Sequence, residues 1–194
     1  MSLLRTFIAI EIPVPIQNAI QRQTATLHKA LDSSLVRWVS THNIHLTLKF
    51  LGDVSPANIE MLMQMLIQEA EQQPEFDIHV SGIGSFPTSR RPRVIWVGLH
   101  APAVLETLQR NIDSSAGRLG YAPEERPFSP HLTIGRVRQN LSTASLQKIR
   151  NVLEGTQVGD LGSAKIDSVH LFKSDLQPGG SVYTRLFSAP LGKQ

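Results

Sequence analysis

A short motif that occurs twice constrains this chain more than any other feature. His45-Leu46-Thr47-Leu48 recurs 86 residues later as His131-Leu132-Thr133-Ile134. One such motif would mean little, because a lone histidine in a strand usually has a structural role or simply faces solvent. Two motifs, each flanked by similar apolar residues, indicate one site built from two copies of the same unit.

The residues around the first motif alternate between apolar and polar types, which predicts a β-strand over 43–50. The predicted buried face carries Leu46, Leu48 and Phe50. The opposite face carries His45, Thr47 and Lys49. Residues two apart in a strand are separated by about 6.7 Å, so the imidazole and the hydroxyl should stand side by side.

The motif is part of a longer repeat. With an offset of 86 residues, Ile8-Ala9-Ile10 falls on Val94-Ile95-Trp96, and the helix start at Ser55 falls one residue before Ser142. Strand, helix, His-x-Thr strand and helix therefore follow in the same order twice, which predicts an internal duplication. A pseudo-twofold axis would place the two His-x-Thr strands opposite each other across a cleft.

The remaining elements follow from periodicity and from proline and glycine positions. Further strands are predicted at 6–12, at 36–39, within 75–86, at 94–99, at 163–173 and at 181–188. Helices are predicted at 15–32, from Ser55 to before Pro74, at 102–119 and from about Ser142.

Composition limits the class of protein. The 194 residues include no cysteine, which excludes disulfides, thiolate catalysis and zinc–thiolate sites. No apolar run approaches the roughly 20 residues that span a bilayer, and the first residues lack the pattern of a secretory signal. We therefore expect a soluble, cytoplasmic protein, and its net charge of +3 permits a polyanionic ligand without requiring one.

Paired histidines and threonines suit phosphoryl transfer. Imidazole titrates near pH 6.5, so one ring can accept a proton while the other donates one. Two hydroxyls beside them can donate hydrogen bonds to phosphate oxygens. A zinc or iron site is the alternative, but it usually needs a third histidine or a carboxylate, and neither motif has Asp or Glu within two residues of its histidine. We expect no metal.

The sequence resembles the RNA 2′,3′-cyclic phosphodiesterases, also called 2′–5′ RNA ligases, of the 2H phosphoesterase superfamily. The segments that carry the resemblance are 7–13, 37–39, 45–52, 86–87, 92–98 and 128–136. The resemblance implies an α+β fold for a single domain, 1–194, made of two duplicated, pseudo-symmetric lobes with antiparallel sheets and flanking helices. The active-site cleft would lie between the lobes.

The resemblance also implies a reaction. The substrate would be a 2′,3′-cyclic phosphate at an RNA end, hydrolysed without metal or cofactor to a 2′-phosphomonoester. His45 would protonate the leaving 3′ oxygen, His131 would deprotonate water, and Thr47 and Thr133 would hold the phosphate. With a 5′-hydroxyl in place of water, the same chemistry would give reversible, ATP-independent 2′–5′ ligation.

Three residues are further candidates for substrate binding. Arg136 could contact the phosphate, but strict alternation puts it on the face opposite Thr133 unless the strand bulges near Gly135. Arg93, in a basic loop with Arg90 and Arg91, could guide an RNA backbone or could simply be solvated. Phe128, or Tyr121, could stack on a base or could serve only in packing.

The expected partners are RNA ends or nucleoside 2′,3′-cyclic phosphates, with tRNA fragments among the candidates, and we expect a monomer. One rival is a nucleotide-binding module that performs no chemistry. Another is an enzyme for 2′–5′ oligoadenylates or ADP-ribose cyclic phosphate. Intact histidines in both motifs favour catalysis, because binding alone needs no matched proton donor and acceptor.

Overall fold

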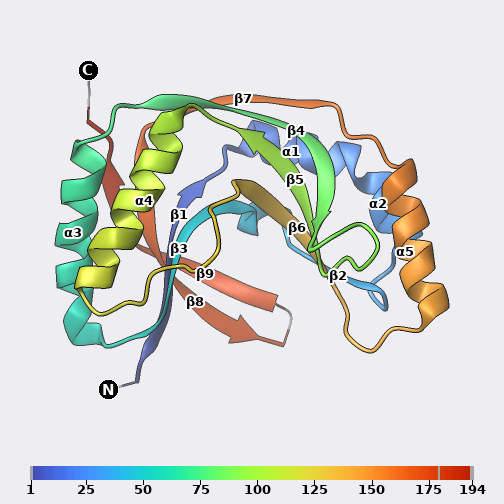
Figure 1. Cartoon of the computed structure of the whole chain (residues 1–194), viewed down its shortest axis with the longest axis horizontal. Helices are drawn as coiled ribbons and strands as arrows, with labels where there is room; N and C mark the ends of the chain where they lie inside the picture. The colour runs from blue at the N-terminus through green and yellow to red at the C-terminus, as the bar shows by residue number, and fades with distance from the viewer. Residues whose placement is uncertain (1, 179, 193–194) are drawn as a thin grey trace.

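Two antiparallel sheets, with helices packed at both sides, make up the computed structural model, which describes residues 2–178 and 180–192 (Figure 1). The strands are β1 (Leu4–Glu11), β2 (Val36–Trp38), β3 (His45–Val54), β4 (Phe76–Phe86), β5 (Val94–His100), β6 (His131–Val137), β7 (Asp160–Ile166), β8 (Ser168–Gln177) and β9 (Gly180–Pro190). The helices are α1 (Val14–Gln23), α2 (Ala25–Ala30), α3 (Ile59–Glu71), α4 (Ala103–Arg118) and α5 (Thr143–Gly155). This architecture confirms the α+β prediction.

The two sheets interlock. One has the strand order β3-β1-β8-β9 and the other β2-β6-β5-β4-β7. β1 and β3 of the first half correspond to β5 and β6 of the second. Each half also contributes a later strand to the sheet of the other half. β8 of the second half pairs with β1, and β4 of the first half pairs with β5. The duplicated halves therefore share their hydrogen-bonded ladders.

The structure corrects three details of the sequence prediction. The C-terminal region forms three strands where two were predicted, because the strand predicted over 163–173 is interrupted at Asp167 and divides into β7 and β8. The segment predicted as one helix over 15–32 divides at Thr24 into α1 and α2. Ile8 corresponds to Ile95 and not to Val94, since each faces the equivalent residue of its neighbouring His-x-Thr strand.

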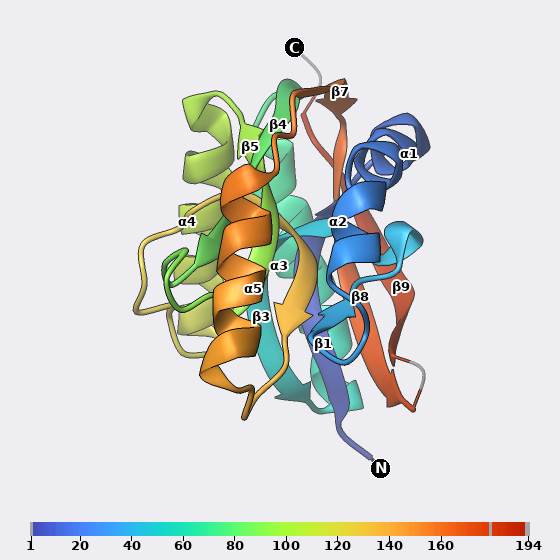
Figure 2. The same ribbon diagram turned by 90° about the vertical axis from the view of Figure 1, so that its right-hand side faces the viewer.

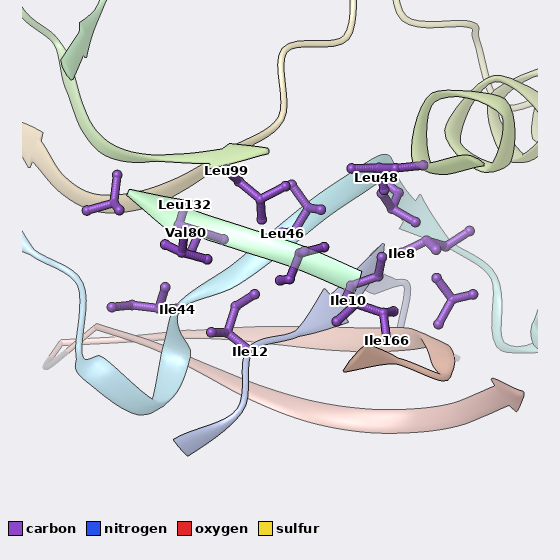
Figure 3. Close-up of a cluster of buried hydrophobic side chains, with 14 of the residues drawn as sticks. Ile8, Ile10, Ile12, Ile44, Leu46, Leu48, Val80, Leu99, Leu132 and Ile166 are labelled. Atoms are coloured by element: carbon purple, nitrogen blue, oxygen red, sulfur yellow. The ribbon is translucent and has the colours of Figure 1, made fainter. Parts of the chain in front are cut away.

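A continuous core joins the two sheets. Buried side chains from both sheets belong to one cluster, including Ile10, Leu46, Val80 and Leu132, which lie close together in Figure 3. β3 also contacts β6 directly. The strands that carry the two motifs are therefore neighbours, held in place by a shared interior.

The helices cover this core at opposite sides. α3 packs against α4, and α4 also contacts β3 (Figure 1). On the other side α2 packs against α5, as the rotated view shows (Figure 2). Within the described part of the chain, no helix has the length and apolar character needed to cross a bilayer.

A β-bulge overturns the predicted faces of β3 beyond Thr47. Ile8 of β1 faces Lys49 while Ala9 faces Thr47, so Leu48 is an extra residue in β3. Leu48 and Lys49 consequently both turn toward the interior, with 4% of each exposed. Phe50, predicted to be buried, is 59% exposed. The expectations for Lys49 and Phe50 were therefore wrong, because strict alternation fails at a bulge.

The buried Lys49 is paired. Its ammonium lies 2.6 Å from a carboxylate oxygen of Asp113 in α4 and also donates to the carbonyl of Ala122. Asp113 in turn accepts from the backbone N–H of Glu124. This network connects β3, α4 and the loop that leads into β6, so it fixes the approach to the second motif.

Removing the carboxylate of Asp113 should leave the charge of Lys49 buried without a partner. We expect Asp113→Asn to lower the free energy of unfolding by about 3–5 kcal/mol, measured by urea denaturation. Glu154→Gln, which breaks the exposed Arg150–Glu154 pair on α5, is the control and should cost less than about 1 kcal/mol. Equal losses in the two variants would contradict a structural role for the buried pair.

His28 gives a pH-dependent contribution to stability. Its ring stacks on Trp38 with 4.0 Å between centroids, and burial lowers the pKa of His28 below 6.5. The unfolded chain then binds the proton more readily than the folded one, so stability is lost as the pH falls below about 6.5. His28→Phe keeps the stacking without the titration. We expect the melting temperature of the wild type to fall more than that of the variant between pH 7.5 and 5.5, and parallel curves would contradict this.

Candidate active site

The two motif histidines are held by the same hydrogen bond. In His45 the Nδ1–H donates to the carbonyl oxygen of Asn43 at 2.7 Å, and in His131 it donates to the carbonyl oxygen of Ser129 at 2.7 Å. A carbonyl oxygen only accepts, so each Nδ1 carries a proton. Each Nε2 is then the nitrogen that can take up or release a proton.

Aromatic contacts hold both rings. The centroid of His45 lies 4.8 Å from that of Phe7 and 5.2 Å from that of Tyr183, which meets it edge-on. His131 meets Phe86 edge-on at 5.0 Å. Rings packed in this way present Nε2 in a fixed direction, as acid–base chemistry requires.

Burial lowers the pKa of His45. The hydrogen bond to Asn43 opposes this effect, and the positive charge of Arg136 adds to it. The neutral form of His45 is therefore favoured in the free protein. An anion bound beside the ring would favour the protonated form again, because opposite charges attract.

The motif threonines lie on the same strand faces as their histidines and are half-buried. Within residues 2–178 and 180–192, neither threonine hydroxyl has a hydrogen-bond partner in the protein. Two fully buried polar atoms elsewhere, Thr6 Oγ1 and Trp96 Nε1, also lack a partner in this part of the chain. Thr47 and Thr133 therefore have free donors next to the imidazoles.

The bulge that the sequence required for Arg136 is present. Ile95 faces Gly135 while Trp96 faces Thr133, so Ile134 is an extra residue in β6. Ile134 and Gly135 both turn inward, which returns the exposed Arg136 to the face of His131 and Thr133. The positive charge of Arg136 also contributes to lowering the pKa of His45 in β3, so Arg136 lies near both motifs.

The equivalent bulge in β3 exposes a residue that the sequence analysis missed. Phe50 occupies the position in β3 that Arg136 occupies in β6. The Phe50 ring lies 6.3 Å from that of Phe7, which itself contacts His45, so Phe50 lies on the histidine face. The matched pattern of the two strands was the available signal, but it required a bulge in both.

The other candidates make contacts of their own outside the two motifs. Arg93 is exposed, and its backbone pairs with Phe86 and Val137 at the start of β5. Phe128 packs against the core and lines a pocket of about 290 Å³ beside α4. The Tyr121 hydroxyl accepts from Asn58. No observation assigns a ligand to these side chains.

A groove of about 630 Å³ begins at His45 and runs over the first sheet. Its lining includes Phe7, Phe172 and Tyr183, but neither Thr47 nor the residues of the second motif. Arg185 in this groove is paired with Glu11 at 2.9 Å. The groove is therefore an aromatic, charge-compensated extension of the His45 side.

The described residues, 2–178 and 180–192, contain no cluster of three or more His, Asp or Glu side chains with the geometry of a metal site. The two motif histidines thus have no third ligand of these types beside them. What the arrangement offers is two oriented imidazoles, two hydroxyls and one arginine.

Known proteins match both halves of this chain. The sequence model of the LigT-like phosphoesterase family matches residues 10–96 and again residues 97–183, one match for each half. The RNA 2′,3′-cyclic phosphodiesterase of Methanothermobacter thermautotrophicus is 33% identical over 93% of this chain and 95% of its own length. The Escherichia coli RNA 2′,3′-cyclic phosphodiesterase is 36% identical over 68% of this chain and 71% of its own.

Solved structures give the same result. The crystal structure of E. coli LigT complexed with 3′-AMP superposes with a TM-score of 0.75 at 28% identity, over 97% of this chain and 98% of that one. A Thermus thermophilus protein, TT0787, shares the fold with a TM-score of 0.80 at 23% identity, over 98% of this chain and 99% of that one. With both halves matched by the family and close curated relatives along nearly its whole length, the chain belongs to the LigT-like phosphoesterases of the 2H superfamily.

Proposed function

We propose that this protein hydrolyses 2′,3′-cyclic phosphates at RNA ends to 2′-phosphomonoesters. The observation that carries the proposal is the matched pair of histidines, each with Nδ1 bonded to a backbone carbonyl and Nε2 left for proton transfer. The curated relatives named RNA 2′,3′-cyclic phosphodiesterase support the substrate. Both duplicated halves would act together as one domain, since the reaction needs a histidine from each.

The proposed reaction has one histidine on each side of the phosphorus atom. His131 Nε2 takes a proton from water as the water oxygen bonds to phosphorus. The bond from phosphorus to the ribose 3′ oxygen breaks, and His45 donates its Nε2 proton to that oxygen. The product carries its phosphate on the 2′ oxygen, and the two histidines have exchanged protonation states.

His45 must be protonated for this role, although burial favours its neutral form in the free protein. We propose that the bound phosphate supplies the missing stabilisation, since its negative charge would lie close to the ring. The same anion would offset the charge of Arg136. Substrate binding would thus prepare the acid.

The remaining residues would bind the substrate. The Thr47 and Thr133 hydroxyls would donate to the non-bridging phosphate oxygens, and Arg136 would neutralise the charge that develops on them. The exposed ring of Phe50 offers a surface on which the nucleobase could stack. Arg93 would contribute at most a more distant contact with the RNA backbone.

The substrates that we propose are RNA ends and nucleoside 2′,3′-cyclic phosphates, tRNA fragments included, handled by a monomer without a cofactor. A 5′-hydroxyl in place of water would join to the cyclic end through a 2′–5′ linkage, with His131 again as the base on the attacking hydroxyl and His45 as the acid on the departing 3′ oxygen. The ring strain of the cyclic phosphate would drive it without ATP.

The proposal predicts kinetics for single variants. His45→Ala and His131→Ala should each lower kcat for a nucleoside 2′,3′-cyclic phosphate by roughly 10²–10⁴, the usual contribution of one acid or base. The assay is run in EDTA, and the product is identified by the position of its phosphate. A 2′-phosphate product is expected from the wild type.

Two controls make the assay decisive. His79→Ala, which removes an exposed histidine on β4 outside both motifs, should leave kcat unchanged. A phosphodiester with a good leaving group, such as p-nitrophenol, should restore much of the activity of His45→Ala but little of that of His131→Ala. Full activity in either motif variant would contradict the two-histidine mechanism, and turnover that EDTA abolishes and zinc restores would contradict metal independence.

A further inference from the structure

A second arginine lies beside Arg136. In the pairing of β2 with β6, Arg37 is directly opposite Arg136, between the pairs Val36–Val137 and Trp38–Gly135. Residues directly opposite in an antiparallel pair point to the same side of the sheet, with Cβ atoms about 5 Å apart. Arg37 therefore extends the face that carries His131 and Thr133.

The neighbours of Arg37 confirm this orientation. Trp38 points to the other side, where its ring stacks on His28 of α2 and its indole N–H donates to the carbonyl of Leu31. A Cβ on Gly135 would come within 2.8 Å of both Trp38 and Val36, so these side chains cover Gly135 on the interior side. With Trp38 and Val36 inside, Arg37 is on the outside, and it is exposed.

Among the described residues, neither of the two guanidinium groups has an acidic partner. In the part of the chain that the structure describes, the ion pairs of arginine involve Arg118, Arg150 and Arg185. Arg37 and Arg136 make neither an ion pair nor a side-chain hydrogen bond there. Like charges directly opposite in a sheet are destabilising, so this pair costs stability unless an anion lies between or over it.

We propose that Arg37 binds a second phosphate, the phosphodiester on the 5′ side of the nucleotide that bears the cyclic phosphate. This inference rests on the proposed function, in which Arg136 serves the reacting phosphate. Adjacent arginines on neighbouring strands then serve adjacent phosphates of one RNA strand. The preferred substrate is accordingly an oligonucleotide end, and a mononucleotide leaves Arg37 unused.

Equilibrium binding of reaction products tests this without requiring turnover. The ligands are uridine 2′-phosphate, the dinucleotide UpU with a terminal 2′-phosphate, and the same dinucleotide with an uncharged methylphosphonate linkage. Arg37→Gln is compared with Arg22→Gln, which removes an equal charge from an exposed position on α1. Calorimetry gives Kd at several salt concentrations, and the hydrolysis assay above reports separately on the proposed function.

We expect Arg37→Gln to weaken binding of the dinucleotide about tenfold, in the range for a hydrogen bond to a charged group, and that of uridine 2′-phosphate less than twofold. The salt dependence of dinucleotide binding should decrease by about 0.7 in log–log slope, the value for one contact to a single strand. The methylphosphonate ligand should bind the wild type about as weakly as the normal dinucleotide binds Arg37→Gln. Arg22→Gln should match the wild type.

Other results would overturn the inference. Equal weakening of both phosphate ligands would place Arg37 on the terminal phosphate or in the fold. An unchanged Kd for the dinucleotide would remove Arg37 from the site. Retention of tight binding by the methylphosphonate ligand would assign the contact to the second base or sugar. The melting temperature of Arg37→Gln should equal or exceed that of the wild type, because a like-charge contact is removed.

Discussion

The architecture of the site depends on two β-bulges at equivalent positions. In β3 and in β6 one extra residue follows the motif threonine, so that two successive side chains turn inward. Each strand can therefore supply a histidine and a threonine and then a third outward residue, Phe50 or Arg136. Without the bulges these two residues would point into the core, and Lys49 and Gly135 would face the ligand.

The duplicated framework is symmetric, but the side chains placed on it are not. Lys49 takes the inward position in β3 and forms an ion pair with Asp113, whereas Gly135 takes that position in β6 and leaves room for Trp38. The outward positions carry an aromatic ring in one half and a guanidinium in the other. In our proposal the two halves therefore bind different parts of the substrate: the first half binds the nucleoside and the second binds phosphates.

Much of this was predictable from the sequence. The motif pair, its strands and the duplication follow from residue type and spacing, because side-chain alternation and helix periodicity are local properties. The faces of Lys49 and Phe50 were not predictable, because a bulge is a property of the pairing between strands and leaves no clear mark on one strand alone. For Arg136 the glycine at 135 gave the needed hint, and β3 has Lys49 at that position.

Long-range pairing explains the other omissions. The exchange of β4 and β8 between the sheets, and the position of Arg37 opposite Arg136, depend on which strands meet. The hydrogen bonds from the histidines to Asn43 and Ser129 are local, two residues back in each case, yet they depend on ring orientation. A sequence motif specifies which residues are present and leaves the tautomer open.

In the proposed mechanism both motif histidines carry their proton on Nδ1 and present Nε2 to the substrate phosphate. Long-range ¹H–¹⁵N NMR of the imidazole rings at pH 7.5 tests it directly, with assignment by His45→Ala and His131→Ala. We expect the Nδ1–H tautomer for both rings in the free protein, and a gain of the doubly protonated form at His45 when a 2′-nucleotide binds. An Nε2–H tautomer at either ring would contradict it.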